Sequence, residues 1–64
     1  MPLINIEVFE GRLDTETETK LIEGVTDLFV DIFGERVRDA TWVLLKETHP
    51  SRWGIAGKPN KPLT

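Results

Sequence analysis

Apolar and polar side chains alternate at the start of the chain. Ile4, Ile6 and Val8 would share one face of an extended segment, whereas Asn5 and Glu7 would share the other. This period of two predicts a β-strand over residues 3–8.

Apolar residues then recur every three or four positions, the spacing of one helix face. We predict a helix of roughly 19 residues that begins at a capping box of Thr15 and Glu18, with Asp14 as the alternative cap. Gly34 should end it, because glycine adopts a left-handed conformation without steric cost. Gly24 costs about 1 kcal/mol relative to alanine inside a helix, which indicates close packing against another element. The apolar stripe comprises Leu21, Ile22, Val25, Leu28, Phe29, Ile32 and Phe33.

Residues 41–45 are β-prone and almost continuously apolar, which is typical of a strand covered on both faces. Lys46 and Glu47 are predicted to end this strand. A strand, a helix and a strand in this order predict an α/β fold, with one right-handed βαβ unit and two parallel strands. Residues 52–57 predict a short hairpin or loop closed by glycines, and residues 58–64 an extended tail. We expect one domain over residues 1–64.

Composition points to assembly. A chain of 64 residues buries only about 60% of its unfolded surface, and this one has no cysteine and a single histidine, so disulfides and a closed zinc site cannot support it. Oligomerisation is the remaining source of stability. The net charge of −3 with scattered basic residues argues against nucleic acid, and the apolar runs are too short for a membrane span. We expect a cytoplasmic protein.

Three short segments, spread over nearly the whole chain, resemble the 4-oxalocrotonate tautomerase family. The resemblance implies βαβ subunits in a homohexamer, built as a trimer of dimers. It also implies a cofactor-independent isomerase that interconverts keto and enol forms of a small carboxylate-bearing enol or oxo acid, as in aromatic degradation. The segments are Pro2-Leu3-Ile4, Glu10-Gly11-Arg12 and Trp53-Gly54-Ile55-Ala56-Gly57.

Pro2 is the candidate catalytic residue. Once Met1 is removed, Pro2 carries a free secondary amine, and a free α-amino group has a reference pKa of about 7.7–8.0. Burial and nearby arginine cations would lower this pKa toward the range in which a general base works at neutral pH. The alternative is that proline only begins the first strand.

Arg12, Trp53 and Phe9 are candidate substrate-binding residues. A planar guanidinium suits bidentate binding of a carboxylate, and the resemblance assigns the substrate carboxylate to Arg12. It assigns Trp53 to an apolar pocket wall beside Pro2, and it places Phe9 at another wall position. The alternatives are a solvated turn for Arg12, interface packing for Trp53, and core or interface packing for Phe9.

Trp42 marks a departure from the family pattern, because it aligns with the family's second arginine, which polarises the substrate carbonyl. Losing one such donor commonly costs roughly 10²-fold to 10³-fold in turnover. Arg36, Arg38 and Arg52 are candidate replacements, and the alternative for each is a helix-end charge or a rim residue. A dicarboxylate substrate is in doubt.

Two other functions stay open. In a hydratase related to the 3-chloroacrylic acid dehalogenases, Glu10 or Glu47 would activate water. In a hetero-oligomer, the chain would be a non-catalytic subunit whose partner supplies the missing arginine. His49 is expected to be an exposed turn residue, and the acidic residues lack metal-ligand spacing.

Overall fold

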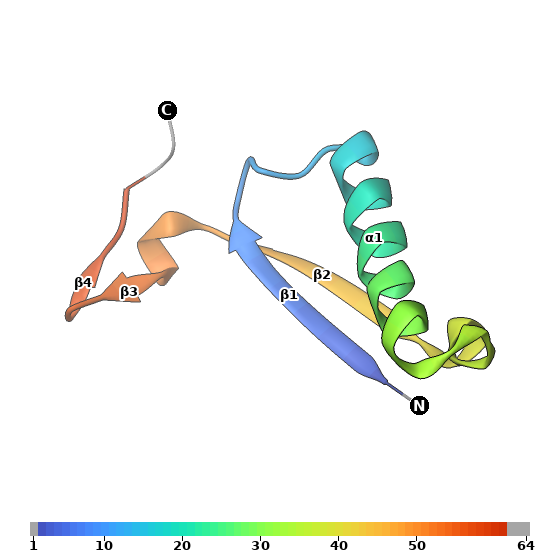
Figure 1. Cartoon of the computed structure of the whole chain (residues 1–64). Coiled ribbons are helices and arrows are strands. Elements are labelled where there is room, and N and C mark those ends of the chain that lie inside the picture. Colours follow the sequence, from blue (N-terminus) through green and yellow to red (C-terminus); the bar gives the residue numbers. More distant parts are fainter. Residues whose placement is uncertain (1, 62–64) are drawn as a thin grey trace.

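The computed structural model describes residues 2–61, and it is a βαβ unit followed by a small hairpin (Figure 1). Strands β1 and β2 pair in parallel, from Leu3 opposite Trp42 to Phe9 opposite Thr48, and the helix α1 connects them. The predicted fold class is therefore confirmed. The elements are β1 (Leu3–Phe9), α1 (Thr15–Phe33), the 3₁₀ helix η1 (Glu35–Ala40), β2 (Trp42–Thr48), the 3₁₀ turn η2 (Pro50–Arg52), β3 (Gly54–Ile55) and β4 (Lys58–Pro59).

Helix α1 begins one residue earlier than the predicted capping box requires. Asp14 is the cap: its carboxylate accepts the Thr17 N–H at 2.8 Å, and its own N–H donates to the Thr17 hydroxyl at 2.8 Å. The box of Thr15 and Glu18 is wrong, because Thr15 already lies inside the helix. The Thr17 N–H lowers the pKa of the Asp14 carboxyl below its usual value. Gly34 ends the helix at φ 101°, as predicted.

Strand β2 and the hairpin both extend beyond their predicted limits. Lys46 and Glu47 lie inside β2, because the ladder with β1 continues to Thr48. The ladder is formed by backbone groups, so polar side chains do not end it. Lys58 and Pro59, predicted in the tail, pair with β3 instead. Positive φ values of 54° at Ala56 and 79° at Gly57 form the tight turn between β3 and β4. Residues 62–64 of the predicted tail lie outside the described residues.

The single chain has almost no core of its own. Pro50 is the only buried residue among residues 2–61, and large apolar side chains are exposed on both layers. On the sheet face away from α1, Leu3 and Trp42 are each 55% exposed, so within the single chain this face of β2 is bare. The radius of gyration is 14.5 Å, compared with about 11 Å for a compact domain of this length.

Two further features concern the helices. Apart from the neighbouring residues and backbone of its own helix, no atom in residues 2–61 lies within 4 Å of the Cβ position that an alanine would add at Gly24, so the close packing expected there does not occur within the described residues. Within residues 2–61, no helix combines the length and the apolarity that a membrane span requires.

Candidate functional site

The candidate site residues fall into two groups at opposite ends of β1. Pro2 precedes the strand, and Arg12 follows it in the turn toward α1. Seven residues of strand at about 3.3 Å each separate the two ends by roughly 20 Å. Trp53 directly precedes β3, and the β3–β4 hairpin lies toward the end of β1 that leads to Arg12 (Figure 1). One chain therefore does not form the single pocket predicted for Pro2, Arg12 and Trp53.

Pro2 lines an apolar cavity of about 280 Å³. The other lining residues are Phe29 and Phe33 of α1 and Val37 of η1, so no charged side chain of the described chain lines it. The Pro2 carbonyl accepts the Trp42 N–H at 2.9 Å, which ties the start of the chain to the start of β2. The backbone of Pro2 is thus anchored beside an apolar hollow.

The strand position bonded to Pro2 carries a tryptophan, while Arg36 and Arg38 flank Val37, which lines the Pro2 cavity. Trp42, which we predicted at the position of the family's second arginine, lies opposite Leu3. Of the candidate replacements, Arg38 is already paired, with nitrogen-to-oxygen distances of 2.9 Å to Asp27 and 2.8 Å to Glu35. The hydrogen bond from Arg38 holds the pKa of the Glu35 carboxyl below its usual value. Arg38 therefore acts in a local ion-pair cluster.

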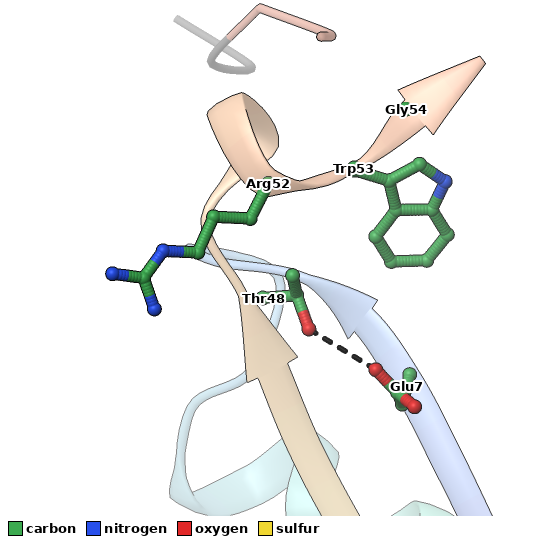
Figure 2. A pocket seen from close by; sticks show the side chains of 5 residues that line it. All are labelled: Glu7, Thr48, Arg52, Trp53 and Gly54. Atoms are coloured by element: carbon green, nitrogen blue, oxygen red, sulfur yellow. Dashed lines mark hydrogen bonds between the residues drawn. The ribbon is translucent and has the colours of Figure 1, made fainter. Parts of the chain in front are cut away.

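A larger cavity, of about 490 Å³, lies at the other end of the strands (Figure 2). The Trp53 ring meets the Phe9 ring edge-on, with centroids 4.6 Å apart and planes at 84°. This contact brings the two aromatic residues together at one end of the sheet, where Trp53 but not Phe9 lines the cavity. The lining residues are Glu7, Thr48, Arg52, Trp53 and Gly54.

Arg52 lines this larger cavity, which neither Arg36 nor Arg38 does. Figure 2 shows its guanidinium pointing away from the Trp53 ring, while the Thr48 hydroxyl donates to the Glu7 carboxylate at 3.2 Å. Of the three candidate replacements, Arg52 is therefore the one that shares the Trp53 end of the strands, away from Pro2 and Trp42.

The turn that carries Arg12 is held by three hydrogen bonds. The Glu10 N–H donates to the Thr48 carbonyl at 3.0 Å, and the Arg12 N–H donates to the Phe9 carbonyl at 3.2 Å. The Gly11 N–H donates to the Glu47 carboxylate at 2.7 Å. Sequence reasoning missed this contact, because 36 positions separate the partners and only the strand register brings them together.

The side chain of Arg12 is exposed and has no hydrogen bond or ion pair with any residue in the range 2–61. Its guanidinium is accessible to a carboxylate from outside the chain. Glu10 and Glu47, the candidates for water activation in the hydratase alternative, line neither cavity.

His49 is an exposed cap and not part of either cavity, as expected of a turn histidine. Its Nδ1 accepts the Ser51 N–H at 3.1 Å at the start of η2, and its Nε2 lies 3.9 Å from the Glu10 carboxylate. Within residues 2–61, no group of three or more His, Asp or Glu side chains is arranged to hold a metal ion.

Comparisons with known proteins agree on one family. The model of the family described as "Tautomerase enzyme" matches residues 2–61. A probable tautomerase of Dickeya dadantii is 36% identical over 58 residues, covering 91% of this chain and 85% of that protein. Among solved structures, TomN, a 4-oxalocrotonate tautomerase homologue in the tomaymycin biosynthetic pathway, has a TM-score of 0.81 and 31% identity, covering 91% of this chain and 86% of the other.

The crystal structure of DmpI from Helicobacter pylori is also similar to this chain. Its TM-score is 0.79 and its sequence identity 30%, and the match covers 91% of this chain and 94% of the other. The βαβ unit, the C-terminal hairpin and the family match over residues 2–61 lead to one assignment. The chain belongs to the tautomerase family.

Proposed function

We propose that the chain is a cofactor-independent keto–enol tautomerase whose general acid and base is the amine of Pro2, exposed by removal of Met1. Membership of the tautomerase family supports tautomerase activity in general. The observation that carries the assignment to Pro2 is its position on an apolar cavity of about 280 Å³, with its carbonyl bound to the Trp42 N–H. The residue is fixed in place, and its nitrogen would be the chain terminus.

Apolar surroundings favour the neutral amine over the ammonium ion, because they do not solvate the charge. A neutral amine can take the proton of an enol hydroxyl, and the ammonium ion so formed can deliver that proton to the enol carbon, which leaves the amine neutral again. The reverse transfers regenerate the enol. The net change is the movement of one proton from oxygen to carbon. No redox step is involved.

We propose further that each active site is shared between chains. Pro2 of one subunit would act on a substrate whose carboxylate is bound by Arg12 of another, with Trp53 and Phe9 as the apolar wall. The roughly 20 Å separation along β1 and the exposed apolar side chains support this arrangement. A homohexamer, built as a trimer of dimers, is the assembly that we propose.

The substrate that we propose has one carboxylate and an apolar remainder. Phe29, Phe33 and Val37 surround Pro2 with hydrocarbon, and Trp42 places an indole where a second cation would be needed for a dicarboxylate. An aryl enol acid such as phenylenolpyruvate fits this chemistry. Arg52 is the cation that we propose to assist at the carbonyl.

The test is the ketonisation rate of phenylenolpyruvate with the parent protein, Pro2→Ala, Arg12→Ala and a co-assembled mixture of the two variants. Each variant alone should be inactive or strongly impaired. The mixture should recover part of the activity, because some sites would combine an intact Pro2 with an intact Arg12. Full activity of Pro2→Ala would refute the proposal.

A non-catalytic subunit of a hetero-oligomer is the second candidate, favoured by the absence of an arginine at Trp42 and by the same exposed apolar surfaces. It predicts that the purified chain is inactive alone and gains activity only with a related chain that provides an arginine. Activity of the homo-oligomer would eliminate it.

A further inference from the structure

The turn from Phe9 to Arg12 leaves one backbone donor, the Gly11 N–H, without a partner inside the turn. The Arg12 N–H closes the turn on the Phe9 carbonyl at 3.2 Å, and Gly11 has φ 93°, as in a type II turn. In such a turn the N–H of the third residue takes no part in the closing hydrogen bond. The Gly11 N–H therefore needs another partner.

Glu47, near the end of β2, provides that partner. Its carboxylate accepts the Gly11 N–H at 2.7 Å, a short distance typical of a hydrogen bond with a charged acceptor. The bond links the turn to β2, in addition to the backbone bond from the Glu10 N–H to the Thr48 carbonyl. Glu47 is thus the one side chain among residues 2–61 that anchors the backbone next to Arg12.

We infer that Glu47 is a positioning residue that fixes the Gly11–Arg12 peptide and thereby aims the Arg12 guanidinium at the substrate carboxylate. This inference rests on the proposed role of Arg12 in substrate binding. Glu47 makes no ion pair with Arg12 in the structure, and Arg12 has no partner of its own in residues 2–61. Glu47 therefore orients the arginine through the backbone without competing for its charge.

The sign of the effect separates this role from simple electrostatics. Removing a negative charge near Arg12 should strengthen the binding of an anion if charge alone matters. Loss of an anchor should weaken it, because a misplaced guanidinium forms poorer bonds with a carboxylate. Glu47→Ala distinguishes the two effects by direction.

The experiment measures both turnover and binding in the intact oligomer. Phenylenolpyruvate gives KM and kcat, and 3-phenylpropanoate, which has no enol to convert, gives a Kd from the shift of the backbone amide signal of residue 12 in an NMR titration. The variants are Glu47→Ala, Glu47→Gln and the matched control Glu23→Ala, which removes an equal charge from an exposed site on α1. Arg12→Ala and the double variant Arg12→Ala/Glu47→Ala complete the set.

We expect Glu47→Ala to raise KM and Kd about tenfold with little change in kcat. Glu47→Gln should recover most of this loss, because its amide oxygen can accept the same N–H, and Glu23→Ala should not raise either constant. In the Arg12→Ala background, Glu47→Ala should add nothing. A rise in KM or Kd caused by Glu47→Ala in the Arg12→Ala background would overturn the inference. Tighter binding of 3-phenylpropanoate by Glu47→Ala alone would overturn it as well.

The binding measurement keeps this inference separate from the proposed reaction. If phenylenolpyruvate is not converted but the pattern of Kd values holds, the tautomerase proposal fails and the role of Glu47 stands. If the parent protein shows no Arg12-dependent binding of 3-phenylpropanoate, the inference itself is refuted.

Discussion

Pro2 and Arg12 lie at the two ends of the same strand, one before β1 and the other in the turn that follows it. The strand holds them roughly 20 Å apart, and the β1–β2 ladder keeps it extended. A small enol acid cannot span this distance. If both residues act on one substrate, they must come from different subunits, and assembly becomes a condition for activity.

We predict that the protein is an oligomer at micromolar concentration. Leu3, Trp42 and Leu44 leave one sheet face apolar and exposed, and Leu28 and Ile32 do the same on α1. Such surfaces are stabilised by contact with other subunits. Analytical ultracentrifugation should give a mass close to six times the chain mass of 7.3 kDa. A stable folded monomer would contradict both the assembly and the shared site.

We predict that Arg12→Ala lowers kcat/KM for a carboxylate substrate by about 10-fold to 100-fold, the effect of losing a hydrogen bond between charged groups. The melting temperature should hardly change, because the Arg12 side chain is exposed and makes no hydrogen bond or ion pair in residues 2–61. Arg12→Lys keeps the charge without the bidentate geometry, so its kcat/KM should lie between those of the parent and Arg12→Ala. Unchanged kcat/KM in Arg12→Ala would return Arg12 to the role of a solvated turn residue.

We predict that Trp42→Arg raises activity toward a dicarboxylate oxo acid by at least about tenfold, because it restores a cation near the developing oxyanion. The side chain at this position is 55% exposed in the single chain, so an arginine does not have to enter a core there. Trp42→Phe is the control, since it shortens the aromatic group without adding charge. A folded, oligomeric Trp42→Arg protein with no gain on such substrates would argue against the alignment of Trp42 with the family's second arginine.

We predict that the Asp14 cap makes stability depend on acid. Its carboxyl has a pKa lowered from 3.8 in the folded chain, mainly by the Thr17 N–H. The stabilisation is therefore complete above the unfolded-state pKa and is lost as pH falls through the lower folded-state pKa. Asp14→Asn keeps a capping oxygen without the titration, so its melting temperature should fall less than that of the parent between neutral pH and about pH 3.

A matched comparison is available for this measurement in Glu18→Gln, which removes a charge from the first helical turn without touching the cap. The melting temperature of this variant should retain the pH dependence that the Asp14 carboxyl gives the parent. An Asp14→Asn protein with the same acid profile as the parent would show that the cap does not contribute to it.

The order and type of the main elements could be predicted from the sequence, because the periods of two and of three to four are strong along β1 and α1. Their limits were harder to predict. Thr15 and Glu18 match a capping pattern as well as Asp14 and Thr17 do, and only the backbone shows which pair lies at the helix end. The polar Lys46 suggested a strand end, but backbone pairing with β1 decides where β2 stops.

The candidate site was predictable only residue by residue. Pro2, Arg12 and Trp53 could be selected from short motifs, yet motifs carry no information on distance, and the length of β1 separates Pro2 from the other two. The contact of Glu47 with Gly11 depends on strand register, which no local pattern of the sequence contains. Sequence reasoning could therefore name residues but not their neighbours.

The most direct test of the central claim is the specific activity of two preparations whose intact masses show Met1 either fully retained or fully removed. With Met1 attached, the Pro2 nitrogen is a tertiary amide whose lone pair is delocalised into the carbonyl, so it cannot act as a base. We predict that only the trimmed protein converts phenylenolpyruvate, while both preparations show the same mass in ultracentrifugation. Equal turnover by the two would contradict the assignment of Pro2 as the catalytic base.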